Sequence, residues 1–212
     1  MIRFNKTHKD EAVKVTVETI NKGHHQVTYR GVKAIRCPFD YVMYQMILSE
    51  VQPDLIIEIG TRKGGGAYYM ADLLDSIGKG IVHTIDIEDD VEPVVKKHER
   101  IKFFTEGWAG YDIELTKGFE KILIIEDASH MYEDTIGVLN KFHAVVSKDS
   151  YLIVEDGIIN ELGLKKEYNG GPLRAIREFM PKHPEYMVDR KWCDMFGMNG
   201  TFNVNGYLKK KK

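Results

Sequence analysis

The chain has 212 residues, which fits one large domain with a sizeable core better than two small domains. With 43% hydrophobic residues, 29% charged residues and 6 Pro, it is unlike disordered, collagen-like or disulfide-dense proteins. Thirty basic and 32 acidic residues give a formal net charge of -2, so no overall positive field favours nucleic acid or an anionic membrane.

Cysteine content and the chain ends bear on the cellular compartment. Cys37 and Cys193 are too few for a disulfide framework, which indicates a reducing interior. Residues 1–10 lack an apolar signal region, and no apolar run reaches the roughly 18 residues that span a bilayer. We therefore expect a cytoplasmic protein with neither a membrane nor a nucleic acid as partner. The lysines at 209–212 we interpret as a solvated tail.

The predicted elements alternate along the chain. Residues 39–51 have the spacing of an amphipathic helix, which ends before Gln52-Pro53. From residue 55 onward, short apolar segments alternate with helix-like segments, as in a largely parallel sheet that is covered on both faces. The predicted strands are 55–59, 81–85, 101–104, 122–125 and 151–154. The predicted helices are 66–76, 91–98, 132–146 and 173–180. Residues 186–188 and 202–208 predict a closing antiparallel pair.

A glycine-rich turn, Glu58-Ile-Gly60-Thr-Arg-Lys-Gly64-Gly-Gly66, follows the first strand. Missing side chains let a ligand approach the backbone there, at the start of a helix. Arg62 stands where the dinucleotide fingerprint has its second glycine, which disfavours NAD. The turn predicts a nucleotide site. The alternative is a tight strand-to-helix turn without a ligand.

Asp86 ends the second strand. A carboxylate at this place can bind both ribose hydroxyls of a nucleoside. The alternative is an acidic turn over residues 86–90 that caps the next helix, a role that suits Asp89 or Asp90 better.

Carboxylates also follow the fourth and fifth strands, where Asp127 and the pair Glu155-Asp156 stand. Parallel strands would bring them together, and a hard cation such as Mg²⁺ would relieve their repulsion. The alternative is that Asp127 caps a helix and Glu155-Asp156 form a polar turn. His130 lies just past Asp127, and an imidazole suits a general base at physiological pH, although a lone histidine is more often structural.

Several motifs, taken in order, resemble one known family. They are the turn at 58–66, the strand end at Asp86, Asp127-Ala-Ser-His130, Val154-Glu-Asp-Gly157, Gly170-Gly-Pro-Leu-Arg-Ala-Ile176 and Asn205-Gly-Tyr-Leu208. Together they resemble the cephalosporin hydroxylase-like family, which is related to the macrolide-sugar and rhamnosyl O-methyltransferases. The resemblance covers about residues 30–208.

The resemblance implies an α/β, Rossmann-like class I methyltransferase fold. Its mostly parallel sheet would have about seven strands, an antiparallel edge strand and helices on both faces. S-adenosylmethionine would lie over the glycine turn, and Mg²⁺ would bind Asp127, Glu155 and Asp156. The expected cofactor contacts are Glu58, Gly60, Thr61, Gly64, Gly65, Asp86, Glu106 and Asp127. His130 stands where the distantly similar catechol O-methyltransferases carry a lysine base.

The implied function is Mg²⁺-dependent O-methylation of a hydroxyl on a sugar or another small acceptor. We divide the chain into an N-terminal segment, 1–38, which caps the site or contacts substrate or another subunit, and a methyltransferase domain, 39–212. A homo-oligomer is compatible with the apolar residues near 192–198. Two alternatives stay open: a nucleotide-dependent oxidoreductase or hydroxylase, and a non-catalytic nucleoside-binding protein. An iron hydroxylase is disfavoured, because its triad needs two histidines and only His130 lies near these acids.

Overall fold

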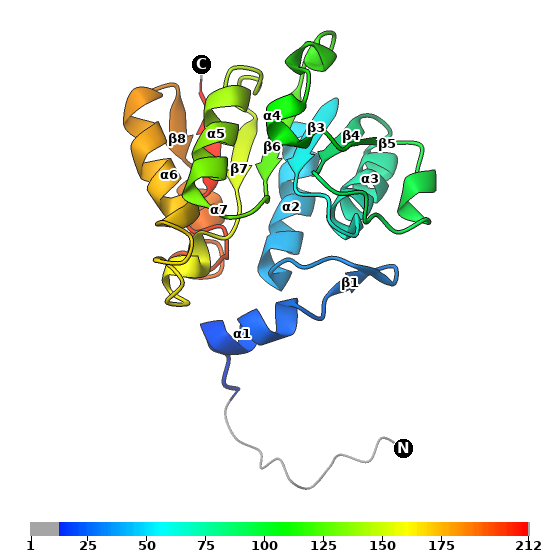
Figure 1. Ribbon diagram of the computed structural model, residues 1–212. Helices are drawn as coiled ribbons and strands as arrows, with labels where there is room; N and C mark the ends of the chain where they lie inside the picture. Colours follow the sequence, from blue (N-terminus) through cyan, green and yellow to red (C-terminus); the bar gives the residue numbers. More distant parts are fainter. Residues whose placement is uncertain (1–12, 212) are drawn as a thin grey trace, which may run out of the picture.

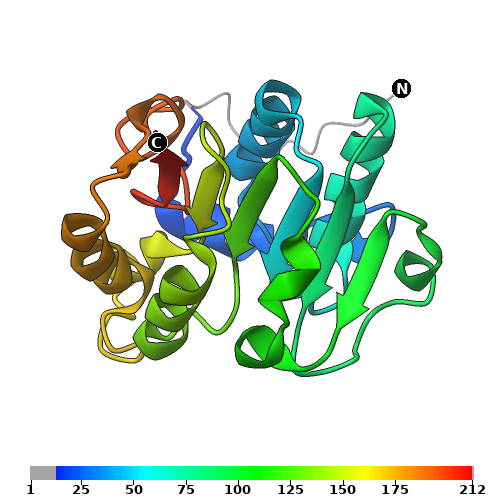
Figure 2. The ribbon, with the colours of Figure 1, turned by 90° about the horizontal axis from the view of Figure 1, so that it is seen from above.

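A seven-stranded sheet runs through the middle of the molecule, with helices on both faces (Figure 1, Figure 2). The structure is a computed structural model, and it describes residues 13–211. The strands are β3 (Leu55–Ile59), β4 (Ile81–Ile85), β5 (Ile101–Phe104), β6 (Ile122–Glu126), β7 (Tyr151–Val154), β8 (Tyr186–Val188) and β9 (Tyr207–Lys210). Their order is β5-β4-β3-β6-β7-β9-β8. The first five are parallel, and β9 pairs antiparallel with both β7 and the outermost strand β8. The expected fold class is confirmed.

Helices precede and connect these strands. They are α1 (Val17–His24), α2 (Pro38–Val51), α3 (Gly65–Ile77), α4 (Gly107–Gly110), α5 (Tyr132–Phe142), α6 (Gly171–Phe179) and α7 (Arg190–Cys193). A small hairpin pairs β1 (Thr28–Tyr29) with β2 (Val32–Lys33). The short 3-10 helices are η1 (Val95–Lys97), η2 (Ile113–Thr116), η3 (Gly157–Asn160) and η4 (Met180–Lys182). Within residues 13–211, every helix is too short or too polar to cross a membrane.

The central strands are buried on both faces of the sheet. Successive side chains of a strand point to opposite faces, so an uninterrupted apolar run supplies two cores. Ile56 and Ile125 pack in a cluster with residues of α2, α3 and α7. Ile57 and Ile124 pack in the other cluster with residues of α5 and α6. Figure 2 shows these two helical layers on either side of the strands.

Most predicted elements are confirmed, and the differences have local causes. The predicted helix over 91–98 is wrong: only η1 forms there, because Pro93 lacks an N–H and disfavours helical backbone at the residue before it. The predicted helix over 132–146 ends at Phe142. Of residues 202–208, only Tyr207 and Leu208 lie in β9, which continues to Lys210.

The chain before β9 is fixed against the end of β7 and against α2. The N–H of Val154 donates to the carbonyl of Gly206 over 2.9 Å. Asp40 of α2 is fully buried and accepts hydrogen bonds from the N–H of Phe202 and from the hydroxyl of Tyr207, each over 3.2 Å. A late segment of the sequence therefore supports the strand end that carries Glu155 and Asp156.

Two glycines after β3 allow close approaches between parts of the backbone. Gly60 has φ +105°, and a Cβ there would overlap the carbonyl of Asp127. A Cβ on Gly65 would overlap the carbonyl of Lys33. The turn was expected to leave room for a ligand, but at these two positions the missing side chains make room for other segments of the chain itself.

We expect Gly60→Ala to lower the free energy of unfolding by about 3 kcal/mol or more, because the added methyl group meets backbone atoms that have little freedom to move. Gly118 is a matched control, since it has φ +92° but open space where a Cβ would lie. Gly118→Ala should lower the free energy of unfolding by only about 1–2 kcal/mol, the cost of the conformational strain that it adds. Urea denaturation measures both changes, and equal losses would show that the collision at Gly60 contributes nothing.

Candidate active site

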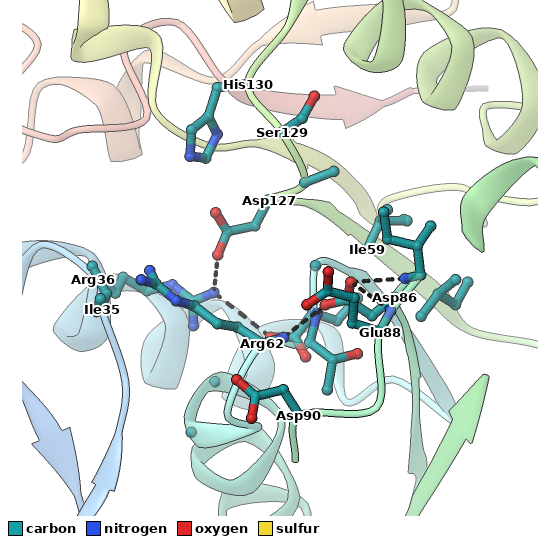
Figure 3. A pocket seen from close by; sticks show the side chains of 18 of the residues that line it. Ile35, Arg36, Ile59, Arg62, Asp86, Glu88, Asp90, Asp127, Ser129 and His130 are labelled. Carbon is teal, nitrogen blue, oxygen red and sulfur yellow. Dashed lines mark hydrogen bonds and ion pairs between the residues drawn. The ribbon is translucent and has the colours of Figure 1, made fainter. Parts of the chain in front are cut away.

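The carboxyl ends of β3, β4, β6 and β7 meet at one edge of the sheet and line a cavity of about 530 Å³ (Figure 3). Open α/β sheets bind their ligands beyond such strand ends. The predicted site residues in its lining are Glu58, Gly60, Thr61, Gly65, Asp86, Asp127, His130 and Asp156. Gly64, Glu106 and Glu155 are outside the lining: Glu106 is exposed, whereas Gly64 caps α3 and Glu155 is buried. Their predicted roles stay predictions.

Asp86 organises one end of the cavity. One carboxylate oxygen accepts hydrogen bonds from the backbone N–H groups of Thr61 and Arg62, over 2.9 and 2.8 Å. The other oxygen accepts from the N–H of Ile87 over 2.7 Å. Asp86 therefore fixes the glycine turn and its own carboxylate in place. The side chain of Ile87, 78% exposed, adds an apolar surface beside it.

Arg36 lies among the acids at the ends of β3, β6 and β7. Its guanidinium grips Glu155 with two contacts, Nε to Oε2 at 3.0 Å and Nη2 to Oε1 at 2.7 Å. The same Nη2 lies 3.4 Å from Asp127 and 3.8 Å from Glu58. The hydroxyl of Tyr44 donates to Oε1 of Glu155 over 2.6 Å. One buried cation thus contacts three carboxylates (Figure 3 shows its contact with Asp127).

Burial sets the pKa values in this group. Burial lowers the pKa of Arg36, but the charges of Glu155 and Asp127 outweigh that effect and keep it well above its usual range. Burial raises the pKa of Glu58 to about 7, although Arg36 and a hydrogen bond from Thr84 oppose the shift. Burial and the charge of Glu155 also raise the pKa of Asp127 well above its usual range. The site therefore has more acids than Arg36 can neutralise.

A set of possible metal ligands lies at the other end of the cavity. Asp127, His130 and Asp156 each offer one ligand atom, and these atoms lie within 4.8 Å of one another. His130 Nε2 is 3.3 Å from Asp156 Oδ2. Both residues have positive φ, 60° and 55°, a strained backbone that is typical of functional sites. Carboxylate oxygens with one imidazole nitrogen suit a divalent cation, so the donor chemistry fits Mg²⁺.

The sequence motifs predict Asp127, Glu155 and Asp156 as the three metal ligands. The structure brings Asp127 and Asp156 together and adds His130, whereas Glu155 is turned toward Arg36. Arg36 and Tyr44 were missed, because no local pattern distinguishes them. The available signal was the excess of acids at neighbouring strand ends, which requires a cation of some kind.

Comparison with known proteins places the chain in a family. Residues 21–211 match the family model described as Rhamnosyl O-methyltransferase/CmcI. The rhamnosyl O-methyltransferase of Mycobacterium bovis is 31% identical over 192 residues, which cover 86% of this chain and 78% of that protein. The protein of the same name from Mycobacterium leprae is 28% identical over 192 residues, covering 87% and 83%. The chain belongs to this family.

Members and relatives of the Rhamnosyl O-methyltransferase/CmcI family share the fold. A CmcI structure with SAH superimposes with a TM-score of 0.69 at 16% identity, over 96% of each chain. An O-methyltransferase from Bacillus cereus in complex with SAH gives a TM-score of 0.58 at 15% identity, over 92% of this chain and 90% of that one. The resemblance stated from the sequence motifs and the prediction of a methyltransferase are confirmed. The family match favours this class over the oxidoreductase and the non-catalytic binding protein.

We expect Arg36→Met to lower the free energy of unfolding by about 3–5 kcal/mol, because it leaves Glu155 buried without a partner for its charge. The control is Arg62→Met, at an exposed arginine of the same cavity, which should change stability by less than about 0.5 kcal/mol. Adding Glu155→Gln to Arg36→Met should recover part of the loss. Chemical denaturation followed by circular dichroism tests this order, and equal effects of the two single variants would contradict it.

Proposed function

We propose that this chain transfers a methyl group from S-adenosylmethionine to a hydroxyl of a sugar-like acceptor, with Mg²⁺ as a second cofactor. The observation that carries the proposal is one cavity with two chemically different ends. The turn held by Asp86 forms one end, and Asp127, His130 and Asp156 form the other. The known proteins support it: one related structure is CmcI with Mg and SAM, and the curated relatives are rhamnosyl O-methyltransferases.

The end at Asp86 suits the nucleoside of the methyl donor. The carboxylate is held by backbone N–H groups and keeps lone pairs for the two ribose hydroxyls. The exposed side chain of Ile87 offers an apolar surface for a flat base. Gly60 and Thr61 bring the backbone of the turn to the cavity wall, where the methionine part of the donor would lie.

The acidic end suits Mg²⁺ and the acceptor. Asp127 and Asp156 would hold the ion. Glu155 would be a third ligand if its carboxylate contacted the ion and Arg36 at the same time. When bound, the ion supplies Lewis-acid activation of an acceptor hydroxyl. His130 would accept the hydroxyl proton, and Asp156, whose Oδ2 lies 3.3 Å from Nε2 of His130, would stabilise the protonated imidazole. The remaining task of the protein is to align the two reactants.

We expect Asp86→Ala to weaken the binding of S-adenosylhomocysteine by roughly 10- to 100-fold, because a charged hydrogen-bond partner of the ribose contributes on the order of 1.5–3 kcal/mol. Asp86→Asn should have a smaller effect, since it keeps the shape of the side chain. Asp89→Ala is the control, because Asp89 is exposed, pairs with Lys96 and lies outside the cavity lining. Calorimetric titration measures all three, and an unchanged affinity for Asp86→Ala would contradict the proposed orientation of the donor.

We expect His130→Ala to lower the turnover number by about 10²- to 10⁴-fold at saturating Mg²⁺, with little change in donor affinity, because a general base acts only in the chemical step. Asp156→Asn should instead raise the Mg²⁺ concentration needed for half-maximal rate. His98→Ala, at a histidine outside the cavity lining, is the control. A rate that excess Mg²⁺ restores in His130→Ala would make His130 a metal ligand, and an unchanged rate would remove it from the reaction.

A further inference from the structure

Two histidines and a glutamate meet at a second place, outside the cavity lining. His143 follows α5, His183 follows η4, and Glu185 precedes β8. The Oε1 atom of Glu185 lies 3.1 Å from Nδ1 of His183 and 3.8 Å from Nδ1 of His143. Helix α5 begins two residues after His130, and its 11 residues span about 16 Å, so this cluster lies toward the opposite end of the helix from the active site.

The three side chains are held together by contacts of their own segments. The hydroxyl of Tyr186, next to Glu185, donates to the carbonyl of His143 over 2.6 Å. The ring of His183 stacks on Phe179, with centroids 3.9 Å apart and an interplanar angle of 16°. The ring centroids of His143 and His183 lie 4.2 Å apart. The positions of the donor atoms are therefore largely set by packing.

The donor atoms are also accessible and available. The side chains of His143, His183 and Glu185 are 26%, 17% and 28% exposed, so an ion from solvent can reach them. Lys210 is the positive group facing His143. Its ammonium donates to the carbonyls of His143, Ala144 and Val146 over 3.1, 3.1 and 2.8 Å, so three oxygens offset its charge.

We propose that His143, His183 and Glu185 form a second metal site, specific for a borderline divalent cation such as Zn²⁺. Two imidazoles and one carboxylate are a typical Zn²⁺ donor set, whereas Mg²⁺ prefers oxygen ligands. All three donor atoms lie within 4.8 Å of one another, and tetrahedral Zn²⁺ needs about 3.4 Å, a difference that a small side-chain rotation removes. Bound there, the ion would tie the end of α5 to the edge strand β8.

Calorimetric titration of the metal-stripped full chain with ZnCl₂ tests the site. We expect His183→Ala to lose one Zn²⁺ equivalent or weaken it by more than about 100-fold, and Glu185→Gln to weaken it by about 10-fold or more. Asp156→Asn and His98→Ala should keep that equivalent, because they change the other two His-and-acid clusters of the described residues. MgCl₂ at the same concentrations should not displace it.

Each result has a defined meaning. If His183→Ala and Glu185→Gln bind as much Zn²⁺ as the wild type, or if Asp156→Asn or His98→Ala removes all of it, the proposed site is wrong. Should His183→Ala fail to fold, Glu185→Gln decides, because it is nearly isosteric at a partly exposed position. Loss of methyl transfer is not a readout here, so the test is independent of the proposed function.

Discussion

The clustering of three carboxylates around one buried guanidinium is the constraint on which the site depends. Glu58, Asp127 and Glu155 lie at the ends of three different strands, and each would lose hydration without compensation if it stood alone. Arg36 supplies the compensating charge from a segment that precedes α2. The sheet edge can therefore gather acids densely enough to attract a divalent cation only because this segment is packed against it. Within this segment, residues 33–36 provide part of the wall of the cavity.

The architecture was predictable because its cause is local. Uninterrupted apolar runs such as Leu55–Ile59 and Ile122–Glu126 specify parallel strands that are buried on both faces, and the acids that follow them must then share an edge. The contacts of Arg36 were not predictable in this way. Its partner Glu155 is 119 residues away, and nothing near Arg36 distinguishes it from the other basic residues of the chain. The helix expected over 91–98 failed for a local reason, the proline at position 93.

The glycine turn shows why a correct motif does not give a correct explanation of each residue. The sequence indicated backbone left open to a ligand, and the cavity does lie there. However, the missing side chains of Gly60 and Gly65 make room for the carbonyls of Asp127 and Lys33. The carboxylate of Asp86 likewise accepts a hydrogen bond from the backbone of the turn itself. The same residues therefore specify both the fold of the turn and the shape of the cavity, and a substitution there changes both.

The support that the segment before β9 gives to the end of β7 has a consequence for synthesis. Arg36 is synthesised before strands β3 to β7, whereas Gly206 and β9 are synthesised after them. Strands β3 to β7 can pair before β9 exists, but the Glu155-Asp156 turn gains its support only once β9 has also been synthesised. The acidic end of the cavity should thus reach its final form only after β9 has paired with β7.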